Sequence, residues 1–191
     1  MSTADITVAT ATIPPRVGNL LEEAVRSVQS QTLRPLGGHS VSLDADKVGA
    51  PRTRQRALDG VQTAWVAFLD DDDYFYPHHL ETLWALAHDL NADYVYSWFD
   101  GNNPFPMHRG RQFKIDEPHH TTMTVMVRTE LAKEATFLMP DGPMHQDWMG
   151  EDWQFLLRCA KLCDGNFAGT ADITWHYRVH GTNTSGLPTR W

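Results

Sequence analysis

The sequence lacks any apolar run that approaches the roughly 20 residues needed to cross a bilayer. It contains two cysteines, Cys159 and Cys163, among 191 residues. So few thiols build neither a disulfide framework nor a four-ligand zinc site, and they are typical of a reducing cytoplasm. Residues 1–13 show no basic segment followed by a long apolar core, the pattern of a secretory signal. We therefore expect a cytoplasmic protein without a membrane span.

Several common motifs of nucleotide and ester chemistry are also missing. The sequence has no G-x-x-x-x-G-K-[ST] loop, no G-x-G-x-x-G turn and no G-x-S-x-G elbow. Basic residues number 16 against 24 acidic ones, a formal net charge of -8, so general electrostatic binding to nucleic acid is not expected. These absences argue against P-loop, dinucleotide-binding and acyl-hydrolase proteins. They leave open a nucleic-acid substrate that is bound through a local basic patch.

The residues that are present predict an α/β fold. With 41% hydrophobic residues and seven Trp, the chain has enough apolar material for one sizeable core. In the first hundred residues, short apolar runs alternate with helical spacing, which favours a mainly parallel central sheet flanked by helices. Expected strands are 6–11, 39–43, 65–69 and 94–99, and expected helices are 19–31, 51–58 and one that begins near 77. The second half is less regular, with strands expected at 123–127 and 173–179 and a helix at 151–162.

The most specific feature is a run of four carboxylates, Asp70 to Asp73, directly after the apolar strand W-V-A-F-L. Ligands of parallel sheets bind outside the carboxyl ends of the strands. Oxygen-rich sites suit hard ions such as Mg²⁺ or Mn²⁺. Alternation along an extended segment puts Asp70 and Asp72 on one side and turns Asp71 away, and a tighter bend brings in Asp73. The alternative is a solvated acidic loop.

Three further segments carry candidate site residues. Glu151 and Asp152 start a predicted helix, either as carboxylates that stabilise the helix dipole or with one of them as a general base. Alternation after Trp175 puts His176, Arg178 and His180 on one face, as metal or phosphate ligands or as structural side chains. A basic helix start at 52–56 is either a solvated face or a set of cations near an anionic ligand.

Four blocks, in order, resemble glycosyltransferases of the GT-A fold, most of all the large inverting family numbered 2. Residues 6–16 are similar to the family's nucleotide-binding opening. Residues 52–58 with 65–73 resemble its A-R-N-x-G helix and F-L-D-x-D-D strand end, although Thr53-Arg54-Gln55 departs from the usual Asn-x-Gly. Gly150-Glu-Asp-Trp looks like its E-D motif, and residues 177–185 look like its closing Y-R-x-H-x-x-N-x-S segment.

The resemblance implies roles for the matching residues. Asp152 would be the general base and Glu151 an acceptor-binding or supporting carboxylate. Asp44 would contact the nucleotide base, with Asp46 an equally placed candidate. The residues expected at a divalent metal, Mn²⁺ or Mg²⁺, are Asp70, Asp72, Asp73 and His180. The residues expected at the nucleoside-diphosphate sugar are Thr10, Ala11, Thr12, Arg16, Asp44, Asp46, Arg52, Asp70, Asp71, Arg178 and Ser185.

The resemblance also implies a reaction and an organisation. It implies one GT-A domain over 1–191, with a nucleotide-sugar half at 1–100 and an acceptor half at 101–191. The reaction would be metal-dependent, inverting transfer of a sugar from a nucleotide donor, most simply a UDP-sugar. Small single-domain versions look like phage-type enzymes, which implies a location in the host cytoplasm. The acceptor would then be a modified nucleic-acid base, a protein or a glycan, with Arg109, Arg111 and Lys114 as a patch for DNA phosphates.

The rival hypotheses are a metal-dependent nucleotidyltransferase, a non-catalytic binding module and an acidic structural or virion-associated protein.

Overall fold

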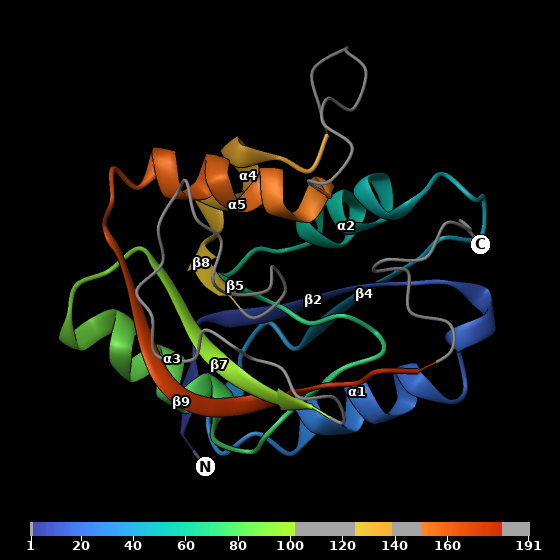
Figure 1. Ribbon diagram of the computed structural model, residues 1–191, viewed down its shortest axis with the longest axis horizontal. Coiled ribbons are helices and arrows are strands. Elements are labelled where there is room, and N and C mark those ends of the chain that lie inside the picture. Colours follow the sequence, from blue (N-terminus) through green and yellow to red (C-terminus); the bar gives the residue numbers. More distant parts are fainter. Residues whose placement is uncertain (1, 102–124, 139–149, 181–191) are drawn as a thin grey trace.

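The computed structural model describes residues 2–101, 125–138 and 150–180. Over these residues the chain forms a curled seven-stranded sheet with helices on both faces, the α/β architecture predicted from the sequence (Figure 1). The strand order is β4-β2-β5-β8-β7-β9-β6. Among the described residues, no helix has the length and apolar character that a membrane span requires.

The alternation expected in the first hundred residues is present. The strands are β2 (Ile6–Thr12), β4 (His39–Leu43), β5 (Trp65–Phe68) and β7 (Tyr94–Gly101), and the helices are α1 (Leu20–Gln29), α2 (Ala50–Asp59) and α3 (His79–Asp89). Strand β2 runs parallel to both β4 and β5. The carboxyl ends of these three strands therefore meet at one edge of the sheet, where the run of aspartates follows β5.

The second half completes the sheet from the other side. Strand β8 (Val125–Arg128) lies between β5 and β7 and is antiparallel to both. Strand β9 (Phe167–Tyr177) is parallel to β7, and the two-residue β6 (Tyr74–Phe75) pairs antiparallel with β9. The helices are α4 (Thr129–Ala135) and α5 (Glu151–Leu162), and a small separate sheet pairs β1 (Thr3–Ala4) with β3 (Arg34–Pro35). The longest ladders, β2 with β4 and β7 with β9, are parallel.

Strand β9 differs from the prediction, because it begins at Phe167 and ends at Tyr177 instead of spanning 173–179. Four of its first six residues, two Ala, one Gly and one Asp, have little strand propensity, and main-chain pairing with β7 orders them. Gly169 is required there, because a Cβ atom at this position would lie 2.2 Å from the ring of Tyr96. A pattern of side chains alone does not reveal such a strand.

The sheet separates two hydrophobic cores. Side chains of β5 alternate between them, with Val66 and Phe68 in one and Trp65 and Ala67 in the other. The first core also contains side chains of α2, α4 and α5, and the second contains side chains of α1 and α3, in agreement with the helices above and below the sheet in Figure 1. Burial on both faces explains why the strand W-V-A-F is apolar throughout.

Candidate active site

The aspartates after β5 form a compact cluster. The chain bends so that the Asp73 amide donates to the Asp70 carbonyl oxygen at 3.2 Å. Carboxylate oxygens of Asp70, Asp72 and Asp73 lie within 4.8 Å of one another. These three residues, called the Asp cluster below, are the set that alternation and a tight bend predicted to face one metal. His180 Nε2 lies 3.0 Å from Asp72 Oδ2, so the fourth expected ligand also reaches the cluster.

Asp71 turns away from the Asp cluster toward the exit of β2. Its Oδ2 accepts a hydrogen bond from Thr12 Oγ1 at 2.6 Å, and its Oδ1 accepts one from Arg16 Nη1 at 2.6 Å. The same Arg16 nitrogen lies 2.9 Å from Asp72 Oδ2. Although burial lowers the pKa of Arg16, the charges of Asp72 and Asp71 raise it above the usual value. Three residues expected at the donor, Thr12, Arg16 and Asp71, therefore lie next to the cluster.

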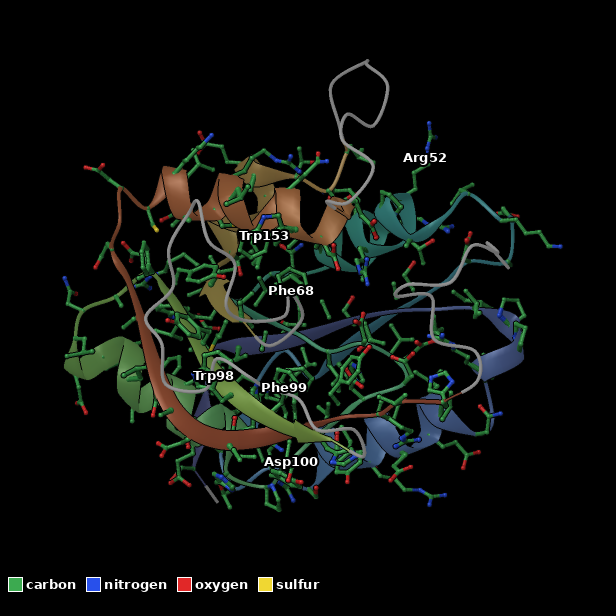
Figure 2. All side chains as sticks on the ribbon, viewed as in Figure 1. Arg52, Phe68, Trp98, Phe99, Asp100 and Trp153 are labelled. Atoms are coloured by element: carbon green, nitrogen blue, oxygen red, sulfur yellow. The ribbon has the colours of Figure 1, made fainter. Side chains whose placement is uncertain are left out.

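Arg54, within the basic helix start at 52–56, is an arginine that reaches the Asp cluster. Arg54 Nη2 donates to Asp70 Oδ1 at 2.9 Å, and Nη1 donates to Glu151 Oε1. Arg52 is exposed and points away from the sheet (Figure 2). Arg54 thus lies beside the Asp cluster, while the predicted role of Arg52 at the donor stays a prediction. Helical spacing could have revealed the position of Arg54, because Arg54 lies one turn before the buried Leu58 on the same face of α2.

The first turn of α5 brings the predicted catalytic carboxylates to the Asp cluster. Phe155 of α5 packs edge-on against Phe68 of β5, with ring centroids 5.3 Å apart, which fixes the helix on the sheet. Glu151 and Asp152 are half-buried, and Asp152 Oδ1 accepts from the Trp153 amide at 2.8 Å. The charges of Asp70, Glu151 and Asp152 raise the pKa of Arg54 even though burial lowers it. Arg54 is therefore a fixed cation between the cluster and the E-D segment.

Negative charge is in excess at the cluster. Burial, followed by the charge of Asp72 and opposed by Arg54, raises the pKa of Asp70 to about 6. Burial and the charges of Asp70 and Asp72 raise the pKa of Asp73 well above its ordinary value, and burial raises that of Asp71. Carboxylates that repel one another in a buried site are stabilised by a bound cation. The donor set, three carboxylates and one imidazole, fits a hard divalent ion such as Mn²⁺ or Mg²⁺.

Residues at and just after the end of β9 contact both the Asp cluster and other elements. The amide of Arg178 donates to Asp73 Oδ1 at 2.8 Å, while its guanidinium Nη2 lies 2.6 Å from Glu23 Oε2 on α1. His176 pairs with Asp100 instead of joining the Asp cluster. The predicted phosphate role of Arg178 stays a prediction. Ser185, the other candidate for the phosphates, lies outside the described residues, as do Arg109, Arg111 and Lys114.

The other residues expected at the nucleotide base lie along β2 and after β4. Thr10 Oγ1 donates to the Leu69 carbonyl oxygen at 2.8 Å and contacts His39 Nε2 at 2.8 Å, while Ala11 is half-buried. Asp44 is buried, and its two oxygens accept from the amides of Val48 and Gly49 at 2.8 and 2.9 Å. The Asp46 side chain is 77% exposed. Asp44 thus shapes the loop before α2, and Asp46 is the candidate that is accessible to a ligand.

Two aromatic residues near the end of β7 belong to the core. Trp98 and Phe99 are 1% and 5% exposed and pack in the core that contains α1 and α3. Figure 2 shows both on β7, with Asp100 at the end of that strand. Asp100 is the member of this segment that reaches solvent, with 47% of its side chain exposed.

Comparisons with known proteins agree with this architecture. The family model described as glycosyl transferase family 2 matches residues 23–145, well over half of the chain. No curated protein is significantly similar to the sequence. The structure of TarS 1–349 from S. aureus in complex with UDP-GlcNAc superposes with a TM-score of 0.72 at 16% identity, covering 99% of this chain and 62% of that one. Another structure of S. aureus TarS superposes with a TM-score of 0.70 at 16% identity, covering 94% of this chain and 37% of that one. The chain thus spans less than two thirds of these proteins, and at this identity the likeness concerns the fold.

Proposed function

The chain belongs to glycosyl transferase family 2 and has the GT-A fold, and we propose that it transfers a sugar from a nucleoside-diphosphate sugar to an acceptor hydroxyl group. We propose a hexose-type sugar and a UDP donor, for which the UDP-GlcNAc and UDP complexes of TarS are the support. Family membership favours this reaction over nucleotidyl transfer, because the E-D and Y-R-x-H segments would have no joint role in a nucleotidyltransferase.

One observation carries the proposal. Arg54 holds Asp70, at the end of β5, and Glu151, at the start of α5, with one guanidinium group. The carboxylates that would hold a metal and the helix turn that carries the candidate base, Asp152, are therefore joined, although their segments are far apart in the sequence. A solvated acidic loop, the alternative for the Asp run, would leave these side chains exposed, whereas Asp72 and Asp73 are buried.

The Asp cluster and His180 are the residues that would hold a divalent ion. Such an ion neutralises the negative charge that develops on a diphosphate leaving group. Arg16, at the same edge of the sheet, adds a fixed positive charge next to Asp72. Residues of the chain itself thus place cations on the donor side of the site.

Asp152 is our candidate for the general base. It would take the proton from the acceptor hydroxyl while that oxygen attacks the anomeric carbon from the face opposite the diphosphate, so that the configuration inverts. A single carboxylate suffices for such a direct displacement, in contrast to the carboxylate pairs of glycoside hydrolases. Glu151, bound to Arg54, would position the helix turn that carries Asp152.

The donor would lie along the carboxyl ends of β2, β4 and β5. Thr12 and Arg16 both donate hydrogen bonds to Asp71 there. Asp46, whose side chain is exposed, is our candidate for contact with the nucleotide base. We propose that residues 1–100 form the donor half of one domain and that 101–191 form the acceptor half. The phage-associated acceptor, a modified DNA base or a virion protein, stays a prediction.

Acceptor-free hydrolysis tests the proposal. Purified protein is incubated with a panel of nucleotide sugars and Mn²⁺ or Mg²⁺, and the released nucleoside diphosphate is measured. We expect slow release from one donor that is abolished by EDTA and by Asp72→Ala. No release and no metal-dependent thermal shift with any donor would favour the non-catalytic binding module instead.

A further inference from the structure

A row of polar side chains crosses three strand ends beside the Asp cluster. In the sheet register, Tyr74 of β6 pairs with His176 of β9, and His176 pairs with Asp100 of β7. Paired residues of neighbouring strands project from the same face of a sheet, so these three side chains form one row. Tyr76, two positions after Tyr74, joins the row through its hydroxyl group. These four residues are called the Tyr-His row below.

The Tyr-His row lies on the side of these strands that the hydrophobic core leaves free. The alternate residues, which point the other way, are buried in the core that contains α1 and α3: Phe75, Phe99 and Trp175. The imidazole of His176 is 19% exposed and the carboxylate of Asp100 is 47% exposed. No residue of the Tyr-His row belongs to either core. The row is thus polar, partly accessible and not needed to fill the interior.

Hydrogen bonds fix the chemistry that the Tyr-His row presents. Tyr76 Oη donates to both carboxylate oxygens of Asp100, at 2.7 and 2.9 Å, and His176 Nδ1 lies 2.9 Å from Asp100 Oδ1. An ionised carboxylate only accepts, so Nδ1 of His176 carries a proton, and when the ring is neutral its Nε2 is an acceptor. The row therefore offers two acceptors to a ligand, the accessible carboxylate and the imidazole Nε2.

The charges around the row disfavour an anionic ligand. The guanidinium of Arg178, over the Tyr74 ring at 5.5 Å from its centroid, is paired with Glu23 at 2.6 Å. The negative charge of Asp100, about half of whose side chain is exposed, remains at the row and would repel a phosphate. The Tyr74 ring, stacked on His176 at 4.7 Å between centroids, adds apolar surface. Hydrogen-bond acceptors beside aromatic rings suit a molecule with hydroxyl edges and C–H faces.

We propose that the Tyr-His row is the acceptor subsite and that it binds a neutral carbohydrate, whose hydroxyl groups donate to Asp100 and to Nε2 of His176. This inference rests on the glycosyltransferase activity proposed above. A sugar on the row lies beside the Asp cluster, because the amide of Arg178, two residues after His176, is bonded to Asp73. A nucleic acid, the other acceptor class expected from the sequence, would bring phosphates next to the carboxylate of Asp100, and is therefore the alternative that the test compares.

The test compares acceptors in the wild-type protein and in Asp100→Asn. The side-chain amide keeps an oxygen for Tyr76 but donates to Nδ1 of His176, so Nε2 becomes a donor. The probes are neutral methyl glycosides and a DNA duplex that contains a hydroxymethylated pyrimidine, each with the donor found by hydrolysis. We expect transfer to at least one glycoside and none to DNA. In Asp100→Asn the KM for the glycoside should rise about tenfold or more, with UDP affinity and melting temperature unchanged.

Asp89→Asn, at an exposed position near the end of α3, is the matched control and should leave the KM for the glycoside unchanged. Transfer to the duplex alone, or a glycoside KM that Asp100→Asn does not alter, overturns the assignment. Donor hydrolysis without transfer to any glycoside also overturns it and leaves the proposed activity standing. Absence of donor hydrolysis and of UDP binding overturns both.

Discussion

Glu151 and Asp70 accept hydrogen bonds from the same guanidinium group, that of Arg54, although 81 positions separate them in the sequence. The side chain of Arg54 is 14% exposed, and those of its two partners are 18% and 28% exposed. Removing one partner of an ion pair that is so little exposed to solvent destabilises a protein, because the remaining charges stay desolvated. Arg54 thus joins the strand end that carries the Asp cluster to the helix that carries the candidate base.

Removing Arg54 should therefore destabilise the protein and disrupt the site. For Arg54→Gln we expect a loss of about 3 kcal/mol in the free energy of unfolding, from urea denaturation, because Asp70 and Glu151 lose their cation. Arg52→Gln, two positions away on the exposed side of α2, is the matched control and should change it by less than about 0.5 kcal/mol. Equal effects of both substitutions would contradict the bridging role.

Replacing the candidate base should remove turnover and keep donor binding. For Asp152→Asn we expect a decrease in kcat of at least about 100-fold, because no carboxylate takes the proton of the acceptor. UDP affinity, measured by calorimetry with Mn²⁺, should stay within about twofold of the wild-type value, which corresponds to less than 0.5 kcal/mol. A parallel loss of affinity would assign Asp152 to donor binding instead.

Metal binding should depend on the Asp cluster. Mn²⁺ should raise the melting temperature of the wild-type protein, because it binds the folded chain and offsets the repulsion among Asp70, Asp72 and Asp73. Asp72→Ala should weaken Mn²⁺ binding by at least about tenfold in calorimetry. Asp89→Ala removes an exposed carboxylate elsewhere and should leave it unchanged. Unchanged Mn²⁺ affinity in Asp72→Ala would place the metal at other residues.

His79 should make the protein sensitive to acid. Burial, and then the charge of His78, lowers the pKa of His79 to about 3, and Nδ1 lies 2.6 Å from Thr174 Oγ1. Between pH 6.5 and 3 the unfolded chain binds a proton at this residue that the folded chain does not bind. The free energy of unfolding therefore falls as the pH drops, by about 1 kcal/mol from pH 6.5 to 5.5.

His79→Asn isolates this contribution, because an amide can retain the bond to Thr174 without titrating. We expect the difference in the free energy of unfolding between wild type and His79→Asn, from urea denaturation, to decrease by about 1 kcal/mol from pH 6.5 to 5.5. His88→Asn, at an exposed position of α3, is the control and should run parallel to wild type. A pH-independent difference for His79→Asn would mean that the folded protein accepts the proton.

Local patterns predicted most elements of the first hundred residues, because strands and helices buried against a core show their period directly. The strand at His39–Leu43 and the helix at Glu151–Leu162 have the predicted bounds. Strand β8 was expected as a strand but not as an antiparallel insertion between β5 and β7. Its place in the sheet depends on pairing partners that no periodicity encodes. Helix α4 was missed, since its seven residues hold too few turns to show a period.

By itself, the sequence determined the fold class, the resemblance and the carboxylates of the Asp cluster, because apolar periodicity and a run of four aspartates are local properties. The tertiary structure decided which cations and acceptors surround them. It placed Arg54 between Asp70 and Glu151, and it separated His176 from His180 by pairing His176 with Asp100. These contacts join residues from different strands and helices. They follow from sheet register and helix packing, which arise only when the whole chain has folded.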